Sequence, residues 1–196
     1  MHYSLTIERQ TKEGMNEVAD QPNAIQPVVI GLAGWSGSGK TTLALKLIAA
    51  LKARGLRVAT IKHAHHGFDV DVPGKDSYAH RQAGADEVVV ASSQRIAHMI
   101  EAPLPDPNQR RSLEELLPRV SGADAVVVEG FKAGTHPKLE IFRPELQRPR
   151  LLGEVPNILA VATPGGLSDG PAGIPVFDLD AIQASLDALL ALFRDA

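Results

Sequence analysis

A glycine-rich segment in the first quarter of the chain has the residue types and the spacing that bind phosphate groups. Gly34, four further residues and then Gly39-Lys40-Thr41 match the phosphate-loop pattern in full. Glycines allow the backbone to curl so that successive N–H groups point at phosphate oxygens. Lys40 would place a positive charge on the β- and γ-phosphates and act in catalysis, and Thr41 would offer its hydroxyl group to Mg²⁺. The predicted nucleotide site comprises Gly34, Trp35, Ser36, Gly37, Ser38, Gly39, Lys40, Thr41 and Thr42.

Glu129 is a candidate metal ligand and catalytic residue far from this loop in the sequence. It follows the apolar run 125–128, which is typical of a buried strand. Open α/β sheets bind ligands at the carboxyl ends of their strands, and an acid there can hold Mg²⁺ or its water shell. We therefore predict that Glu129 and Thr41 bind Mg²⁺ together. The alternative is an acid at a strand end that only faces solvent.

The polar stretch 63–76 contains two further acids and three histidines. Asp69 and Asp71 occupy alternate positions, and we predict that Asp71 reaches the metal ion on Thr41. The stretch would then become ordered when a γ-phosphate is bound, as switch segments do. Two solvated loop acids are the alternative. A transition-metal site is a second possibility for this stretch, but the residue spacing favours histidines that only form hydrogen bonds: His63, His65 and His66.

The elements on either side of the glycine-rich loop are those that a nucleotide site requires. A β-branched apolar run at 28–33 predicts a buried parallel strand directly before the loop. The helix after the loop ends at Gly55, and its apolar residues recur at helical spacing: Leu43, Leu47, Ile48 and Leu51. A second strand at 57–61 completes a strand–loop–helix–strand unit. Trp35, within the loop, is expected either to pack over the nucleotide or to be buried against a neighbouring loop.

The rest of the chain alternates between predicted strands and helices. Further strands are expected at 87–91, 95–100, 125–128, 138–142, 157–163 and 175–179, with 95–100 pairing beside 87–91 and with 138–142 as an edge strand. Helices are expected at 78–83, from the capping box of Ser112 and Glu115, and after a cap of Asp180 and Gln183. This alternation predicts an α/β fold, a three-layer P-loop NTPase sandwich with a mostly parallel sheet and helices on both faces.

The composition is that of an ordinary globular protein. The 196 residues include 44% hydrophobic and 22% charged residues, and the net charge of −3 gives no reason to expect a nucleic-acid partner. The chain has no cysteine, which excludes disulfides and thiolate chemistry and suits the cytoplasm. No apolar run has the roughly 18 residues of a membrane-spanning helix. We expect a polar, mobile N-terminal extension at 1–26 and one nucleotide-binding domain at 27–196.

Several blocks of the sequence resemble one protein family, the molybdopterin-guanine dinucleotide biosynthesis adapter proteins, known as MobB. The blocks occur in the family's order and together span roughly residues 28–142. The stretch that combines histidines with Pro-Gly-Lys-Asp-Ser is far more specific than the phosphate loop. The matching blocks are Ala33-Gly34-Trp35-Ser36-Gly37-Ser38-Gly39-Lys40-Thr41-Thr42-Leu43, Ile61-Lys62-His63-Ala64-His65-His66, the run from Asp69 to Tyr78, Ala83-Gly84-Ala85, and Val128-Glu129-Gly130-Phe131-Lys132.

This resemblance implies a homodimeric GTP-binding adapter in molybdenum cofactor biosynthesis. It implies a weak, Mg²⁺-dependent GTPase activity and a role in assisting the guanylyltransferase that attaches GMP to molybdopterin. The preference for guanine comes from the resemblance alone, because the chain lacks the Asn/Thr-Lys-x-Asp element with which many GTPases bind the base.

Two other functions fit the phosphate loop. A P-loop small-molecule kinase would need an arginine-bearing lid over the transferred phosphoryl group. Two arginine pairs could supply such a lid, although solvated loops are the favoured interpretation: Arg110-Arg111 and Arg148-x-Arg150. A nucleotide-binding module without turnover is the third hypothesis.

Overall fold

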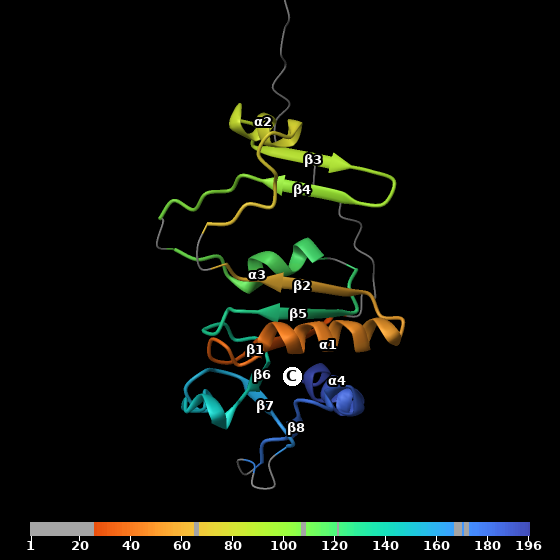
Figure 1. Ribbon diagram of the computed structural model, residues 1–196, viewed down its shortest axis with the longest axis vertical. Helices are drawn as coiled ribbons and strands as arrows, with labels where there is room; N and C mark the ends of the chain where they lie inside the picture. The colour runs from red at the N-terminus through yellow and green to blue at the C-terminus, as the bar shows by residue number, and fades with distance from the viewer. Residues whose placement is uncertain (1–25, 65–66, 107–108, 121, 167–169, 171–172) are drawn as a thin grey trace, which may run out of the picture.

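The computed structural model describes residues 26–64, 67–106, 109–120, 122–166, 170 and 173–196. The predicted extension at 1–26 therefore lies outside the described residues, apart from Gln26. Figure 1 shows a large sheet with helices on both faces and, set apart from it, a smaller unit formed by one helix and two strands.

The large sheet has six strands, and every pairing within it is parallel. Its order is β2-β5-β1-β6-β7-β8. The strands are β1 (Val28–Ala33), β2 (Val58–Lys62), β5 (Ala125–Glu129), β6 (Lys138–Ile141), β7 (Ile158–Thr163) and β8 (Val176–Asp178). The α/β class and the parallel sheet predicted from the sequence are confirmed.

Helices cover both faces of this sheet because alternate strand residues point to opposite sides. On one face, the strands pack against α1 (Lys40–Ala53), the 3₁₀ turn η3 (Ile182–Ser185) and α4 (Leu186–Arg194). On the other face, strand residues Ile61, Val126 and Val128 pack against α3 (Leu113–Leu116) and the 3₁₀ turn η1 (Leu117–Val120). The predicted capping box is present, since Ser112 and Glu115 bond reciprocally at the start of α3.

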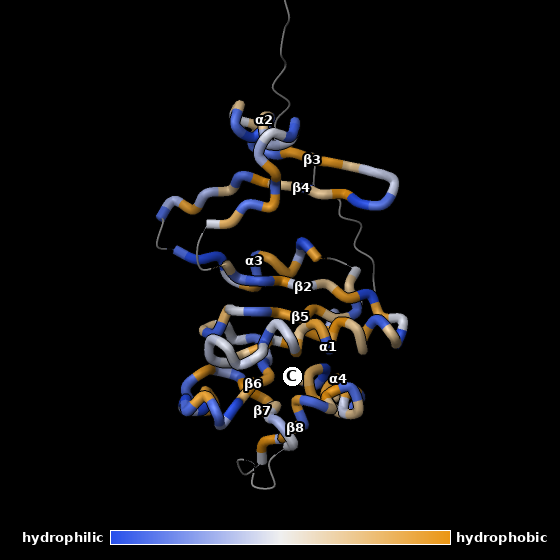
Figure 2. The backbone as a smooth tube through the Cα atoms, viewed as in Figure 1, coloured by the Kyte–Doolittle hydropathy of each residue, from blue (hydrophilic) through white to orange (hydrophobic). Residues whose placement is uncertain are grey.

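A separate antiparallel hairpin forms the smaller unit. It pairs β3 (Glu87–Ala91) with β4 (Ile96–Ile100), and α2 (Asp76–Gln82) packs against β3. The predicted pairing of these two strands is confirmed. Figure 2 shows hydrophobic residues along both strands of this exposed hairpin. None of the helices in the described part of the chain is long and apolar enough to cross a membrane.

Two predictions about strand and helix ends are wrong. The run 138–142 is not an edge strand, since β6 lies inside the sheet between β1 and β7. Asp180 and Gln183 do not cap the last helix, because the 3₁₀ turn η3 precedes α4 and starts without a side-chain cap. Asp180 instead forms an ion pair with Lys46 of α1, with 3.8 Å between Oδ1 and Nζ.

Polar and apolar residues alternate in β6 as they would in an edge strand. The strand is internal nevertheless, because its two polar residues are buried and their charged groups are hydrogen-bonded. Lys138 Nζ donates hydrogen bonds to three carbonyl oxygens, those of Gly134, His136 and Pro156. The Glu140 carboxylate accepts the N–H groups of residues 151 and 152 at 2.6 and 3.1 Å. Buried charges are tolerated when hydrogen bonds replace their hydration, so polar alternation here does not indicate contact with solvent.

His136, two residues before β6, is buried. Its side chain lies against Gly31, where a Cβ atom would be 2.6 Å from the imidazole ring. Neither ring nitrogen has a hydrogen-bond partner among the described residues. Burial and, to a smaller extent, the nearby Lys138 ammonium lower the pKa of His136 to about 4, and Glu114 opposes the shift.

Acidification should destabilise the fold through His136. Its folded-state pKa of about 4 is below the ordinary value of 6.5, so the unfolded chain binds this proton first as the pH falls. The stability associated with the neutral ring is complete above pH 6.5 and is lost by pH 4, by about 3 kcal/mol in total. Urea unfolding at pH 7.5 and 4.5 measures this loss. His136→Gln should show a smaller loss than the parent, and equal losses would contradict the prediction.

Candidate nucleotide site

The phosphate loop connects the end of β1 to the start of α1. Gly37 and Gly39 adopt positive φ angles of 79° and 92°, a region that favours glycine. A Cβ atom on Gly34 would lie within contact distance of the Ser38 hydroxyl and 3.1 Å from the Ile141 carbonyl oxygen. The Ser38 N–H closes the turn onto the Trp35 carbonyl at 3.1 Å. These glycines therefore permit the tight loop that the phosphate-loop pattern predicts.

Lys40 is the first residue of α1, and its side chain folds over the loop. Its Nζ donates hydrogen bonds to the carbonyl oxygens of Gly34 at 3.1 Å and of Trp35 at 2.9 Å. Burial and the neighbouring Lys132 lower the pKa of Lys40, and Glu129 raises it. The ammonium group is thus held at the loop, close to a second cation and an acid.

Glu129 and Thr41 meet at this position, as predicted. Parallel pairing places Glu129 at the end of β5 beside β1, and the Thr41 hydroxyl donates to Glu129 Oε2 at 3.4 Å. Lys62 of β2 is the register partner of Glu129, and their charged groups are 3.8 Å apart. A hydroxyl group beside a carboxylate is the oxygen pair that suits Mg²⁺. Among the described residues, no group of three or more His, Cys, Asp or Glu side chains could hold a metal ion.

The remaining predicted loop residues take two kinds of position. Ser38 and Gly34 are buried, whereas the exposed residues are Ser36, Gly37, Thr41 and Thr42. Trp35 is partly buried, and its Nε1–H donates to the Pro149 carbonyl oxygen at 2.8 Å. Of the two predicted roles for Trp35, the structure shows packing against a neighbouring segment.

Asp71 lies beside α2 rather than beside Thr41. Its carboxylate accepts hydrogen bonds from Ser77 Oγ at 2.9 Å and from Arg81 Nη1 at 3.5 Å. Arg81 also binds Asp69, with 2.8 Å between Nη1 and Oδ1. Figure 1 shows α2 at the far side of the hairpin from the large sheet. A metal role for Asp71 stays a prediction and would require the 63–76 stretch to rearrange.

The histidine-rich stretch is described only in part, because His65 and His66 lie outside the described residues. His63 donates its backbone N–H to the Glu129 carbonyl at 2.9 Å. Its ring packs edge-on against Phe131, with 5.1 Å between the ring centroids. A Cβ atom on Gly130 would be 2.7 Å from the Cβ of His63, so glycine permits this close approach.

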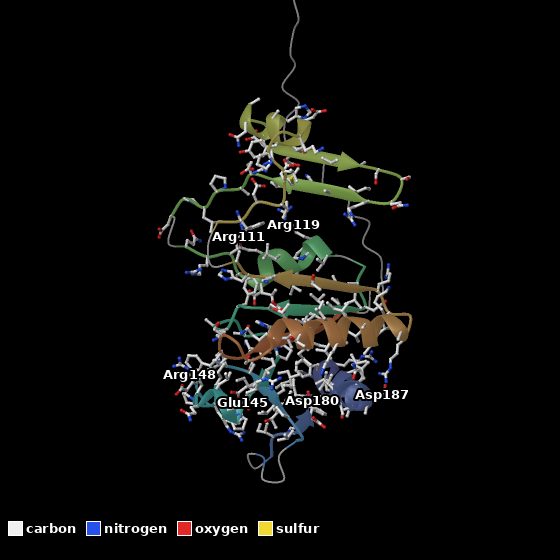
Figure 3. All side chains as sticks on the ribbon, in the orientation of Figure 1. Arg111, Arg119, Glu145, Arg148, Asp180 and Asp187 are labelled. Atoms are coloured by element: carbon white, nitrogen blue, oxygen red, sulfur yellow. The ribbon has the colours of Figure 1, made fainter. Side chains whose placement is uncertain are left out.

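Four cations near the loop complete the site, and the sequence indicated only one of them as a possible nucleotide-site residue. Lys132 and Arg148 lie over the Trp35 ring, 5.2 and 5.5 Å from its centroid. Arg143 Nε donates to the Ser38 carbonyl oxygen at 3.0 Å. The fourth is Lys62. The sequence indicated Arg148, because the Arg148-x-Arg150 pair is a possible lid. Figure 3 shows Arg148 next to Glu145 in the segment after β6. Lys62 and Lys132 lie within two of the sequence blocks that carry the family resemblance, whereas Arg143 follows β6 without any distinguishing local pattern.

Comparisons with known proteins place this chain among the molybdopterin-guanine dinucleotide biosynthesis proteins. Residues 29–164 match the family model described as MobB, molybdopterin guanine dinucleotide synthesis protein B. The molybdopterin-guanine dinucleotide biosynthesis adapter protein of Escherichia coli is 45% identical over 78% of this chain and 84% of its own length. Its counterpart in Haemophilus influenzae is 44% identical over 69% of this chain and 74% of its own length.

Solved structures show the same fold. A crystal structure of molybdopterin-guanine biosynthesis protein B superimposes with a TM-score of 0.64 and 27% identity, over 85% of this chain and 99% of the other. A MobB homologue from Bacillus stearothermophilus gives a TM-score of 0.60 and 29% identity, over 83% and 97% of the two chains. The model match covers more than half of the residues, and the phosphate loop and Glu129 both fall inside it. This chain therefore belongs to the MobB family.

Proposed function

We propose that this protein is a GTP-binding adapter in molybdopterin guanine dinucleotide biosynthesis. In this proposal it hydrolyses GTP slowly with Mg²⁺ and assists the guanylyltransferase that attaches GMP to molybdopterin. The adapter role is supported by its relatives in Escherichia coli and Haemophilus influenzae, both of which are molybdopterin-guanine dinucleotide biosynthesis adapter proteins. The observation that carries nucleotide binding is the meeting of Lys40, Thr41 and Glu129 at one edge of the sheet.

Each of these three groups has a distinct expected role. Lys40 would bind the β- and γ-phosphates, and Thr41 and Glu129 would hold Mg²⁺ between them. Backbone N–H groups of the loop would bind the phosphate oxygens at the positive N-terminal end of α1. The nucleotide would thus be bound by charge and by oriented dipoles, and its hydrolysis would require water activation that these residues supply only weakly.

Calorimetric titration with GTP, ATP, GDP and ADP in the presence of Mg²⁺ tests the nucleotide proposal. The expected result is tighter binding of GTP and GDP than of the adenine nucleotides. Equal or tighter binding of ATP would contradict the assignment of guanine. Guanylyl transfer by a purified guanylyltransferase, measured with and without this protein, tests the adapter role, and an unchanged yield would contradict it.

Glu129→Gln should slow Mg²⁺-dependent GTP hydrolysis more than it weakens GTP binding. The amide keeps the shape of the side chain but lacks the charge that would hold the ion. We expect a decrease of about tenfold or more in the single-turnover rate, since a charged contact contributes about 1.5–3 kcal/mol. Glu154→Gln, which changes an exposed acid in a turn, is the matched control. Rates that equal the parent's throughout a Mg²⁺ titration would make Glu129 only a strand-end acid.

A kinase remains the second candidate because of one observation. Arg148 lies over Trp35 of the phosphate loop, which is where an arginine of a phosphoryl-transfer lid would be found. A screen of phosphoryl acceptors with γ-labelled GTP and ATP separates the two functions. Label transferred to a small molecule would favour the kinase, and label released only as phosphate would favour the slow GTPase.

The hairpin of β3 and β4 supports a homodimer. It exposes Val89, Val90 and Ile96, with 61%, 44% and 73% of their surface accessible. An isolated two-stranded hairpin is marginally stable in water, and clustered exposed apolar side chains usually mark an interface. We therefore propose that a second copy of the chain covers this hairpin.

Introducing charge at this surface should separate the dimer. The double variant Val89→Lys/Ile96→Lys is expected to be monomeric in analytical ultracentrifugation at concentrations where the parent is dimeric. Leu45→Lys, which changes an equally exposed apolar residue of α1, should leave the parent's state unchanged. A parent that sediments as a monomer, or a double variant that remains dimeric, would contradict this assignment.

A further inference from the structure

The segment that follows β6 contacts the phosphate loop at two separate points. Residues 143–149, here named the strap, include the 3₁₀ turn η2 (Pro144–Leu146). At its start, Arg143 Nε donates to the Ser38 carbonyl oxygen at 3.0 Å, and Arg143 Nη1 pairs with Glu145 at 3.0 Å. At its end, the Pro149 carbonyl oxygen accepts the Trp35 Nε1–H at 2.8 Å.

Both ends of the strap are fixed to the large sheet. Before it, the Phe142 N–H donates to the Ala162 carbonyl oxygen of β7 at 2.9 Å. After it, the buried Glu140 carboxylate of β6 holds the N–H groups of Leu151 and Leu152. Within it, the Leu146 N–H closes a turn onto the Arg143 carbonyl at 3.1 Å. The guanidinium group of Arg143 is therefore presented from a backbone that is anchored on both sides.

The contact with Ser38 acts on the peptide that joins Ser38 to Gly39. A trans peptide is planar, and its C=O and N–H groups point in opposite directions. A donor that holds the Ser38 carbonyl on one side therefore directs the Gly39 N–H to the other side. Gly39 has a φ of 92°, and glycines at 37 and 39 leave this part of the loop with little intrinsic preference. A group outside the loop must therefore hold the peptide between Ser38 and Gly39 in the orientation that binds phosphate.

Gly39 also lies beside this contact. A Cβ atom at Gly39 would lie 3.7 Å from Nε and Nη2 of Arg143, which is an ordinary van der Waals distance, so the guanidinium group lies next to the loop at this residue too. The ion pair with Glu145 and the bond to Ser38 use different nitrogens of the fork, which fixes the plane of the group.

We propose that Arg143 is a positioning residue of the phosphate loop: by holding the Ser38 carbonyl outward, it directs the Gly39 N–H toward the phosphates of a bound nucleoside diphosphate or triphosphate. The inference rests on the proposed nucleotide site but concerns the shape of the loop rather than the base. The Gly39 N–H is part of the phosphate loop and does not contact the γ-phosphate alone. The affinities for diphosphates and for triphosphates should therefore depend on Arg143 equally.

Calorimetry on Arg143→Met, Arg143→Lys and the parent tests this role with GDP and GTP. Arg143→Met should weaken both nucleotides by the same factor, about tenfold for the loss of one charge-assisted bond. Arg143→Lys should recover part of this loss, since an ammonium group can also donate to the Ser38 carbonyl. Arg119→Met, at an exposed arginine on the opposite face, controls for the loss of positive charge.

Several outcomes would overturn the proposal. A loss for GTP that greatly exceeds the loss for GDP would make Arg143 a direct γ-phosphate ligand. A similar loss in Arg119→Met would indicate only a general electrostatic effect, and unchanged affinity in Arg143→Met would remove any role. If the parent binds neither guanine nucleotide, the proposed function fails, and ADP and ATP then decide the role of Arg143. A parent that binds no nucleotide overturns both.

Discussion

Lys40→Ala should weaken GTP binding by about 10- to 100-fold, because a charge-assisted contact of this kind contributes about 1.5–3 kcal/mol. The Lys40 ammonium lies at the phosphate loop, where it bonds to the carbonyl oxygens of Gly34 and Trp35. A triphosphate bound there would gain a positive charge within contact distance. The side chain is not part of the apolar core, so the free energy of unfolding should change little.

Calorimetry with GTP measures the affinity, and urea unfolding verifies that the variant is folded. Lys52→Ala is the matched control, since Lys52 lies at the other end of the same helix and bonds only to the Leu56 carbonyl among the described contacts. Parental GTP affinity in a folded Lys40→Ala protein would remove the phosphate site from this loop.

Gly31→Ala should lower the free energy of unfolding by about 3 kcal/mol, near the upper end of the usual cost of overpacking. A Cβ atom at this position would be 2.6 Å from the His136 ring and 2.8 Å from the Pro137 carbonyl oxygen. The second contact is with backbone and cannot move without separating β1 from β6, because the Gly31 N–H bonds to that same oxygen at 3.0 Å.

Urea unfolding monitored by circular dichroism gives the midpoint and slope for each variant. Gly67→Ala is the control, since a Cβ atom there would meet nothing within 4 Å. Adding His136→Ala to Gly31→Ala should restore only part of the lost stability, because the Pro137 oxygen remains in place. A urea midpoint for Gly31→Ala that equals the parent's would contradict the prediction, because β1 and β6 would then be able to move apart without loss of stability.

The geometry of the candidate nucleotide site was predictable where it depends on local sequence. The β-branched run at 28–33, the glycines and the helix after Lys40 lie next to one another in the chain, and each has a strong local preference. Glu129 was also predictable, because parallel strands bring their carboxyl ends to one edge of a sheet. Both predictions required only the order of elements along the chain.

Other contacts between distant segments were not predictable. Lys138 and Glu140 alternate with apolar residues as an edge strand would, and only their partners around 134–136 and 151–156 show that they are buried. Arg143 bonds to a residue 105 positions earlier. For Asp71, the prediction assumed that the chain stays at the sheet edge after β2. Because β2 is at the edge of the sheet, the chain can leave the sheet after β2 and continue into the hairpin unit.

The order of the strands in the sheet also determines when the phosphate loop can reach its folded form during synthesis of the chain. Among the described strands, β1, which carries the phosphate loop, is made before the others, but its two neighbours, β5 and β6, begin only at residues 125 and 138. Until then, both edges of β1 have unpaired N–H and C=O groups. A nascent chain that stalls within this interval would expose an apolar strand of the kind that aggregates. The phosphate-loop motif is therefore made long before the strands that complete its place in the sheet.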